Sequence, residues 1–421
     1  MRRGTNLPRM GDFNQTVVLD VIRRAGGGLA RADVARRTGL SAQTVTNVAR
    51  RLLDLGLVVE EGETARLGPG RPGTLLRLNP VSRYAVGVHL DPATMTFVLL
   101  DLSGAVVAQS RRPTPVPEDP QAVVSGLVDE IEGLLTGARV DRDRVLGVGI
   151  AAPGPIDYAR GVMLDPPHLP GWHDVPLRDA VAERTGLRAV LDKDVIAAAS
   201  AHLWDPSAHA SDFVFFYLGT GVAVSLAVRD EVVRGESGNA GESGHLVVDT
   251  EGTLCWCGKR GCLGAVLRAE ALAEQGVAAG VELPAWGAAV GAELPMWGDG
   301  SDPRAVDEAV VALCAAADAG DERAVAVLRT AGRRLAMGAG VLTDMLDVGT
   351  VLVGGPLWDR IAPYAHEALL AGVAAHQVPG STHQVRAASS SFGPRVTAVG
   401  AGCLLLARAF TPRPTDLLLV S

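Results

Sequence analysis

The sequence predicts an α/β protein in which a small helical DNA-binding domain precedes a larger body. Residues 31–54 have the spacing of a helix-turn-helix, and from Tyr84 onward strands alternate with helices at glycine turns. Residues 1–80 contain thirteen Arg, no Lys and seven Asp or Glu, a net charge of +6, whereas the whole chain carries −8. A basic segment on an acidic body indicates that one end of the protein binds a polyanion.

Length and composition indicate a globular protein of two or three domains. The chain has 421 residues, of which 48% are hydrophobic and 20% charged. It has no run of about 18 apolar residues and no apolar stretch behind its basic start, so we expect neither a membrane span nor a signal peptide. Five cysteines, three of them within residues 255–262, do not have the pattern of a disulfide framework, and we expect a cytoplasmic protein.

Three helices are predicted in the N-terminal segment. The first covers residues 14–25, with Asn14 as its N-cap. A second, short helix ends at Thr38, and Gly39 supplies a tight turn into a third helix that opens at Ser41. In this layout the third helix enters the major groove of DNA by its N-terminal residues.

The polar face of that third helix holds the DNA-contact candidates. They are Ser41, Gln43, Thr44, Thr46 and Asn47 for base edges and phosphates, and Arg50 and Arg51 for the phosphate backbone. The alternative is an amphipathic helical hairpin with a solvated polar face, but the turn, the length and the local charge agree with DNA binding.

A wing is predicted after the three helices. Residues 55–59 begin a strand, and residues 60–79 form a turn and a returning strand, which together predict a winged helix. The turn contains "GPGRPG" at residues 68–73, where Arg71 is extended and suits the narrow minor groove. A plain linker is the alternative for this stretch.

The order of motifs in the body resembles the ROK family of bacterial repressors and sugar kinases. The resemblance covers about residues 14 to 408, and the segments that carry it are "GIAAPGPID", "LGTG", "RGESGNAGESGH", "CWCGKRGC" and "VLVGG". With a winged helix in front, the chain is similar to the repressor branch that includes xylose and N-acetylglucosamine regulators. The resemblance implies an actin-like fold of two α/β lobes around a cleft, so we expect a DNA-binding domain at 1–80 and a ROK domain at 81–421.

The cysteine cluster and one histidine form a candidate metal site. His245, Cys255, Cys257 and Cys262 offer one imidazole and three thiolates, which fit tetrahedral zinc, and the resemblance implies the same four positions. Four protein ligands leave no open position for water, so we expect one structural Zn²⁺ per chain. A redox pair, or unliganded thiols beside a bystander histidine, are the alternatives, but the cluster lacks the spacing of thioredoxin-like centres.

The kinase function that the resemblance also allows is not expected. Family kinases carry Asp-x-Gly-Gly-Thr after the first strand, and this chain has "HLDPAT", in which His89 replaces the acidic residue and Asp91 and Pro92 replace the glycines. Neither replacement can cradle phosphate as glycine backbones do. Asp194 matches the catalytic base, but Lys193 stands where the family has Asn, and its ammonium would pair with Asp194 or hold an anionic ligand. Asp194 is therefore interpreted as a vestigial base.

Sugar recognition is partly retained in the resemblance. The candidate effector-binding residues are Gly154, Lys193, Asp194, Glu242 and His245. Gly264 replaces a sugar-contacting glutamate of the family, which removes an acceptor for a hydroxyl and predicts a weaker or different ligand. A vestigial cleft that binds nothing is the alternative.

These observations predict a DNA-binding transcriptional regulator, in first place a repressor controlled by a sugar or sugar derivative. We expect a homodimer or higher homo-oligomer that places two winged helices on a palindromic operator. The alternatives are an ATP-dependent sugar kinase with an appended domain, and a regulator switched by a protein partner without a small ligand. The repeat "ELPAWG" and "ELPMWG" has no assigned role, although two exposed tryptophans, Trp286 and Trp297, would suit a partner contact.

Overall fold

The computed structural model of the chain describes most of its residues. These are 7–63, 73–115, 118–166, 169–205, 210–219, 221–241, 243–284, 286, 303–376 and 384–412. Arg71, Glu242 and the second copy of the repeat, which includes Trp297, lie outside the described residues.

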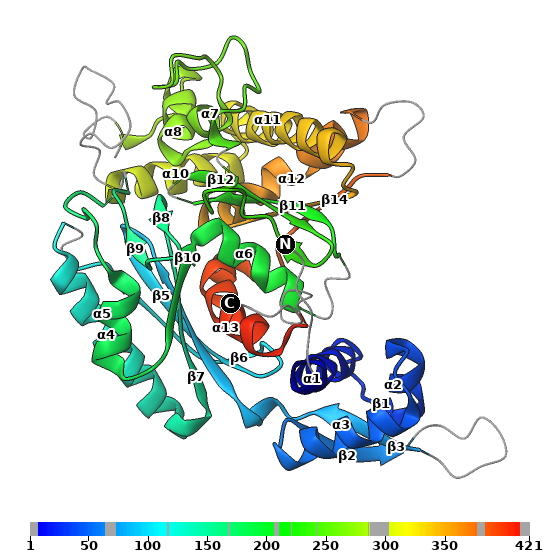
Figure 1. The fold of residues 1–421 in the computed structure, drawn as a ribbon. Coiled ribbons are helices and arrows are strands. Elements are labelled where there is room, and N and C mark those ends of the chain that lie inside the picture. Colours follow the sequence, from blue (N-terminus) through cyan, green and yellow to red (C-terminus); the bar gives the residue numbers. More distant parts are fainter. Residues whose placement is uncertain are drawn as a thin grey trace.

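The N-terminal domain is three helices with a small antiparallel sheet (Figure 1). Its elements are α1 (Leu7–Arg24), β1 (Leu29–Ala30), α2 (Arg31–Thr38), α3 (Ala42–Asp54), β2 (Val58–Glu63) and β3 (Thr74–Leu78), with strand order β1-β3-β2. The prediction that Asn14 caps the first helix is wrong, because α1 begins at Leu7 and Asn14 lies within it. Pro8 lies in the first turn of α1, where its missing N–H costs nothing.

The first lobe of the body is built on a mixed five-stranded sheet of order β10-β7-β4-β5-β6. Its elements are β4 (Tyr84–Leu90), β5 (Thr94–Asp101), β6 (Val106–Pro113), α4 (Pro120–Ala138), β7 (Val145–Ala152), α5 (Leu177–Thr185) and β10 (Ala189–Lys193), with a small hairpin of β8 (Ile156–Asp157) and β9 (Val162–Met163). The inner strands β4 and β7 are almost entirely buried because helices cover both faces of the sheet.

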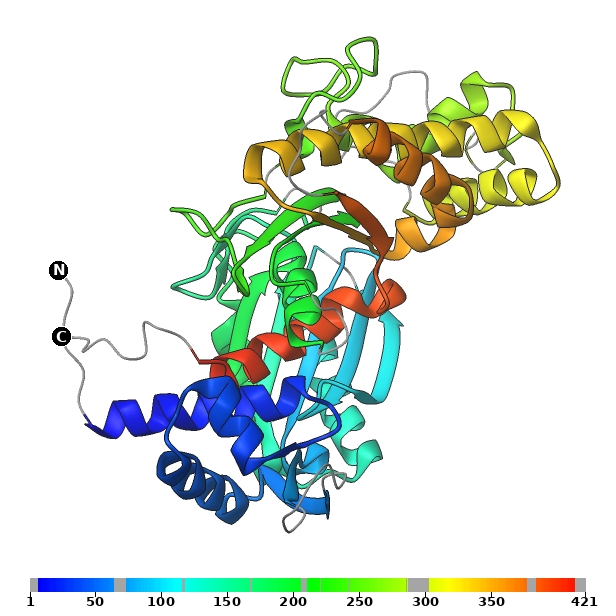
Figure 2. The same ribbon diagram turned by 90° about the vertical axis from the view of Figure 1, so that its right-hand side faces the viewer.

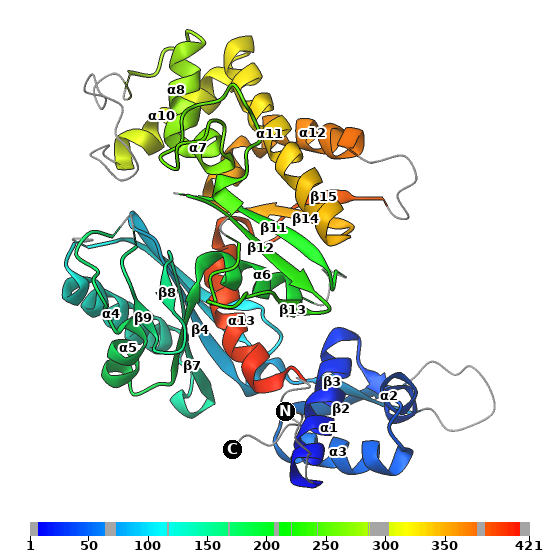
Figure 3. The ribbon, with the colours of Figure 1, turned by 45° about the horizontal axis from the view of Figure 1, so that its top comes forward.

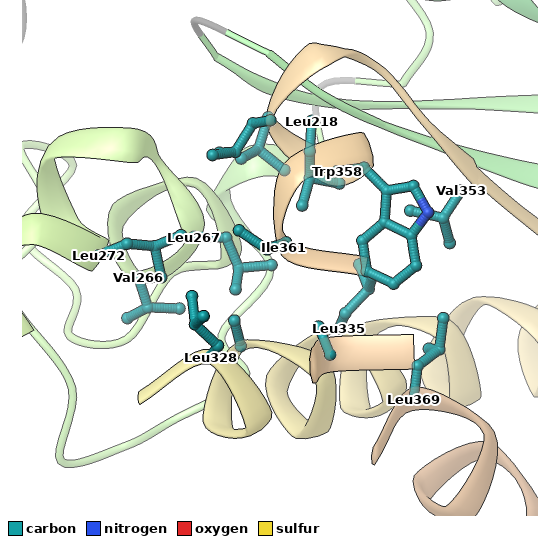
Figure 4. Packing of buried hydrophobic residues seen from close by; sticks show 14 of the residues in the cluster. Leu218, Val266, Leu267, Leu272, Leu328, Leu335, Val353, Trp358, Ile361 and Leu369 are labelled. Atoms are coloured by element: carbon teal, nitrogen blue, oxygen red, sulfur yellow. The ribbon is translucent and has the colours of Figure 1, made fainter. Parts of the chain in front are cut away.

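The second lobe has its own five-stranded sheet of order β13-β12-β11-β14-β15. Its elements are β11 (Phe213–Leu218), β12 (Val222–Val228), β13 (Glu231–Val232), α7 (Leu263–Leu267), α8 (Ala269–Ala278), α10 (Pro303–Asp318), α11 (Glu322–Leu346), β14 (Thr350–Gly354), α12 (Pro356–His376) and β15 (Arg386–Ser389). Figure 4 shows the core of this lobe, where Trp358 and Ile361 of α12 lie among leucines of α11 and α7.

Two helices, α6 (Asp194–Trp204) and α13 (Val396–Phe410), lie between the lobes (Figure 3). Strand β10 leads directly into α6, since β10 ends at Lys193 and α6 begins at Asp194. Figure 2 shows that α13 extends from the body to α1 of the N-terminal domain, and α1 and α13 are in contact. Buried residues of α1 and α13, such as Val18 and Cys403, belong to one continuous hydrophobic cluster, so the two domains share a core.

One tryptophan and two cysteines outside the 255–262 cluster lie in or beside the hydrophobic cores. Trp286 is not an exposed contact residue, because only 6% of it is exposed and it packs into the core of the second lobe with Leu283. Cys403 is buried in the shared core and Cys314 is half-buried in α10, consistent with structural cysteines. No helix in the described part of the chain is both long and apolar enough to cross a membrane.

Candidate DNA-binding helix, effector cleft and metal centre

The turn between α2 and α3 has the geometry that the sequence predicted. Gly39 ends α2 in the left-handed region with a φ of 71° and its N–H donates to the carbonyl of Ala35. Ser41 caps α3, because its Oγ accepts a hydrogen bond from the backbone N–H of Thr44 at 3.1 Å. The start of α3 is therefore fixed by its own side chains before any DNA is present.

The candidate base contacts lie on the exposed side of α3, opposite the buried Val45, Val48 and Leu52. Gln43 and Asn47 are exposed, and Nε2 of Gln43 donates to Oδ1 of Asn47 at 3.3 Å. Their amides lie four residues apart on one face, and such amides pair with adenine in the major groove.

Of three other candidates on α3, two have side-chain groups already engaged and the third is exposed. The hydroxyl of Thr46 donates to the carbonyl of Ala42 at 2.8 Å, so it serves the helix rather than a base. Arg51 forms an exposed ion pair with Asp12 of α1 at 3.2 Å. Arg50 is exposed and points away from the core of the domain, where it suits a phosphate contact.

His245 and the three cysteines converge in the second lobe. Sγ of Cys255 lies 3.5 Å from Nδ1 of His245, and Sγ of Cys257 lies 3.6 Å from Sγ of Cys262. The four donor atoms all lie within 4.8 Å of one another, close enough to bind a metal ion. We call these four residues the metal knot.

Two glycines fold the backbone of the knot. Gly258 and Gly261 have φ values of 86° and 65°, and a Cβ at Gly261 would lie 1.4 Å from the carbonyl oxygen of Asp249. Arg334 of α11 donates to the Asp249 carboxylate at 2.7 Å and so attaches the loop to the lobe. Only glycine fits at residue 261, which explains the "GC" that ends the cysteine cluster.

The donor set fits a tetrahedral metal ion. With bonds of about 2.3 Å to sulfur and about 2.0 Å to nitrogen, the ligand atoms of a tetrahedral zinc site lie about 3.5 to 3.8 Å apart. The Cys255–His245 and Cys257–Cys262 distances of 3.5 and 3.6 Å agree with that geometry, and the remaining donor pairs lie within 4.8 Å. Burial raises the pKa of Cys262 to about 12, whereas a backbone hydrogen bond from Lys259 lowers the pKa of Cys257. A bound cation would stabilise the thiolates that burial disfavours.

The cleft between the lobes contains a small cavity of about 60 Å³. Its lining includes His89, Asp91, Pro92, Asp194, Tyr217 and Gly221. The structure thus brings together the "HLDPAT" loop, the residue that resembles the kinase base, and one glycine of the "LGTG" segment. Side chains of Asp91 and Pro92 border the cavity that glycine backbones would leave open for phosphate.

The titratable groups that line this cavity are acidic or neutral. Burial lowers the pKa of His89, so this imidazole is neutral at neutral pH. Burial, together with the carboxylates of Asp91 and Asp194, raises the pKa of the Tyr217 hydroxyl well above its ordinary value. The lining thus presents two carboxylates and two neutral rings, and the guanidinium of Arg111, which is not part of the lining, acts on both rings. Tyr217 gave no signal in the sequence, because one tyrosine in a buried strand is usual for a core.

Three of the five effector candidates, Gly154, Lys193 and Asp194, lie together at the start of α6. Lys193 is only 4% exposed, and a Cβ at Gly154 would lie 3.0 Å from its Cε, so the two residues are in direct contact. Asp194 is the first residue of α6, and its Oδ1 accepts from the N–H of Val195 at 2.6 Å. His245 lies in the second lobe within the metal knot.

An ion pair between the lobes was missed from the sequence. Arg234, the first residue of "RGESGNAGESGH", donates to the buried Asp192 at 2.5 Å and lies over the ring of Tyr158 at 4.8 Å. Arg408 of α13 donates to the Tyr158 hydroxyl at 3.1 Å. Burial raises the pKa of Asp192, and the Arg234 guanidinium opposes this shift. The segment that resembles the sugar-facing loop is thus attached to the strand that carries Lys193.

A winged helix fused to two α/β lobes, with a cleft between the lobes and a His/Cys cluster in the second one, defines a class of two-domain regulators and related sugar kinases. The chain belongs to the ROK family, which matches residues 85–408. Residues 6–67 match the MarR family.

Curated relatives include both regulators and kinases. The chain is 29% identical over 236 residues to a xylose repressor of Caldicellulosiruptor bescii, covering 56% of this chain and 59% of that protein. It is 25% identical over 362 residues to the DNA-binding transcriptional dual regulator NagC of Escherichia coli, covering 84% and 82%. A glucokinase of Halalkalibacterium halodurans is 31% identical over 193 residues, covering 45% and 58%. The matched region therefore spans about three fifths of the xylose repressor's length.

A solved structure shows the same fold over nearly the whole chain. A ROK family transcriptional regulator, described as a homologue of the E. coli MLC protein, aligns with a TM-score of 0.73 at 23% identity, covering 96% of this chain and 97% of that one. The predicted fold, a winged helix-turn-helix followed by an actin-like ROK domain, is confirmed.

Proposed function

We propose that this protein is a sequence-specific DNA-binding transcriptional repressor controlled by a sugar or sugar derivative in the cleft. The observation that carries the proposal is the combination of a capped, exposed recognition helix with a cleft bordered by Asp91 and Pro92 in place of phosphate-binding glycines. The regulators among its relatives support it. Residues 1–80 form the DNA-binding domain in this proposal, and residues 81–421 form the ROK domain.

The proposed DNA contacts are made by α3 and the wing. Gln43 and Asn47 read base edges, while Ser41, Thr44, Thr46, Arg50 and Arg51 hold phosphates and Arg71 enters the minor groove. Two chains of a homodimer, or of a higher homo-oligomer, bind the half-sites of a palindromic operator. We place the protein in the cytoplasm, where the DNA is.

The proposed effector site joins the two lobes. Gly154, Lys193 and Asp194 supply one side, and Glu242 and His245 supply the other. The metal knot holds one structural Zn²⁺ and so fixes the position of His245. All four ligand positions are filled by protein, so the metal supplies shape and no catalytic water.

Selection of DNA ligands from a random duplex library tests the DNA claim. We expect an enriched palindromic sequence, about 10- to 100-fold weaker binding for Asn47→Ala with loss of preference at one base position, and a uniform loss for Arg50→Ala with a smaller salt dependence. Arg139→Ala, on the exposed end of α4, is the matched control and should bind as the parent does. If the protein enriches no DNA sequence from the library, the proposed DNA-binding function is refuted.

The kinase remains the second candidate because Asp194 and Gly221 still line one cavity and because glucokinases are among the relatives. A coupled assay with ATP and D-glucose, D-xylose or N-acetyl-D-glucosamine decides between the two. We expect no sugar-dependent ATP turnover, together with stabilisation of the protein by one of these sugars or its phosphate. If none of them binds, a regulator switched by a protein partner becomes the better proposal.

A further inference from the structure

Arg23, near the end of α1, joins the DNA-binding domain to the body. It is 5% exposed, and its Nη1 donates a hydrogen bond to the backbone carbonyl of Trp204 at the end of α6. Its guanidinium lies over the Trp204 ring at 4.1 Å. Its other nitrogens donate to Asp20 at 3.2 and 2.6 Å, which orients the guanidinium toward the body.

This contact completes the end of α6. The last carbonyls of a helix have no partner within the helix, and a cation near them also interacts favourably with the helix dipole. Arg23, which belongs to the N-terminal domain, supplies both the hydrogen-bond donor and the positive charge at the end of α6. On its other side Trp204 packs against Gly104, where a Cβ would lie 2.6 Å from Cδ1 of the indole. The end of α6 is therefore held between the first lobe and α1.

The opposite end of α6 lies in the cleft. Asp194, its first residue, lines the cavity beside the proposed effector site, and the helix has 11 residues, about 16 Å in length. One rigid element thus has the cleft at one end and the DNA-binding domain at the other. Figure 1 shows α6 above α13 between the two lobes.

Helix α13 contacts α6 through backbone atoms. A Cβ at Gly400 would lie 1.7 Å from the carbonyl oxygen of Ala197 in α6. On the other side of α13, a Cβ at Gly87 or Gly149 would lie 2.0 or 1.8 Å from carbonyl oxygens of Ala398 and Ala401. Contacts without intervening side chains cannot be absorbed by rotamer changes, so a displacement of α6 would have to shift α13 or break this contact.

We propose that Arg23 is a positioning residue that sets the orientation of the recognition helix relative to the body, and that α6 with α13 transmits movement at the cleft to this joint. The proposal rests on the proposed repressor function. In a dimer this orientation sets the separation of two recognition helices, which must match half-sites one helical turn of DNA, about 34 to 36 Å, apart. An effector that displaces the start of α6 then changes which spacing is bound.

Arg24 provides the matched control. It forms an exposed ion pair with Asp230 of the body at 3.3 Å, and about 40% of each side chain is exposed. Exposed pairs of this kind contribute little to stability. Arg23 and Arg24 are therefore adjacent arginines that both bridge the domains, and only the buried one is assigned a positioning role.

Distance measurements between spin labels test the joint directly. Labels are placed by non-canonical amino acids at the exposed Asp54 and Arg139 of the full chain, which is diluted with unlabelled chain. We expect one narrow distance distribution for the parent and for Arg24→Ala, and a broad one for Arg23→Ala. Arg23→Lys, which keeps a donor and a charge, should partly restore the narrow distribution. A narrow distribution in Arg23→Ala would overturn the proposal.

Operator spacing gives the functional readout. With the selected duplex and a version carrying two inserted base pairs between half-sites, we expect the parent and Arg24→Ala to lose about tenfold or more in affinity. Arg23→Ala should bind a single half-site as the parent does and lose less than about threefold from the insertion. If Arg23→Ala loses as much affinity from the insertion as the parent does, Arg23 does not set the orientation of the recognition helix. If the parent selects no DNA, the repressor function fails, and the label distances still decide the role of Arg23.

Discussion

The metal knot of the second lobe and the α6–α13 pair between the lobes are stabilised in different ways. The knot is four donor atoms within 4.8 Å of one another on a short irregular loop. The pair is two helices whose backbones touch at Gly400 and Ala197. In the knot, burial disfavours the thiolate of Cys262, which a bound cation would offset, whereas the contact of the two helices requires only the absence of a side chain at Gly400.

This difference assigns different roles to the two regions. A loop held by a metal keeps a fixed shape and positions His245 in the proposed effector site. A pair of helices in backbone contact moves as one body and suits transmission toward Arg23. The "HLDPAT" loop places Asp91 and Pro92 at the cavity, while the knot has four donor atoms close enough to bind a metal ion.

Removing one donor should have the largest effect. Cys257→Ser is expected to lower the bound metal from one proposed Zn²⁺ per chain to none, and to lower the free energy of unfolding by about 4 kcal/mol, because metal binding is coupled to folding. Native mass spectrometry and urea unfolding measure the two effects. Cys314→Ser, in α10 and outside the knot, is the control and should keep its metal. A Cys257→Ser protein as stable as the parent would remove the structural role of the knot.

His202 of α6 should lower the free energy of unfolding of the protein as the pH falls. His202 lies near the end of α6 among Phe213, Phe215 and Phe392, and its Nε2 has no hydrogen-bond partner among the described residues. Burial lowers its pKa from 6.5 to about 4. The unfolded chain therefore binds the proton more readily, and stability that is complete above pH 6.5 is lost as the pH falls toward 4.

The variant His202→Phe checks this acid sensitivity. The loss from His202 should reach about 3 kcal/mol at pH 4, at 1.36 kcal/mol for each pKa unit. Urea unfolding between pH 7 and pH 4 should show a smaller decline for His202→Phe than for the parent by about that amount. His173→Phe changes an exposed histidine and should leave the decline unaltered. Parallel declines for all three proteins would contradict the burial effect.

The smallest expected changes in the free energy of unfolding come from alanine substitutions at two helical glycines, Gly400 and Gly133, and they should differ in sign. Gly400→Ala in α13 should lower the free energy of unfolding by about 2 to 3 kcal/mol, because the new methyl group meets the Ala197 carbonyl. Gly133→Ala in α4 meets nothing within 4 Å and should raise it by about 0.5 to 1 kcal/mol. The two variants differ only in their surroundings. Equal changes in urea unfolding would show that the helices are not in backbone contact.

The sequence by itself predicted the local features of this protein. Gly39 and Ser41 define the turn and the cap of the recognition helix because their conformation and hydrogen bond depend only on nearby residues. The spacing of Cys255, Cys257 and Cys262 likewise indicated a metal site, and the "HLDPAT" loop indicated a lost phosphate site.

The tertiary structure alone decided how these local features are connected. Arg23 and Trp204 are 181 residues apart in the chain, and neither belongs to a motif. Tyr217 and Arg234 could not be recognised from the sequence either. A buried tyrosine or a paired arginine gains its role from residues that only the packed lobes bring near. Nothing in the sequence distinguishes Gly400 from the other glycines among the 50 of the chain, and only its contact with the Ala197 carbonyl explains why a side chain does not fit there. Local geometry follows from neighbouring residues, whereas the link between cleft and DNA-binding helix depends on contacts between distant ones.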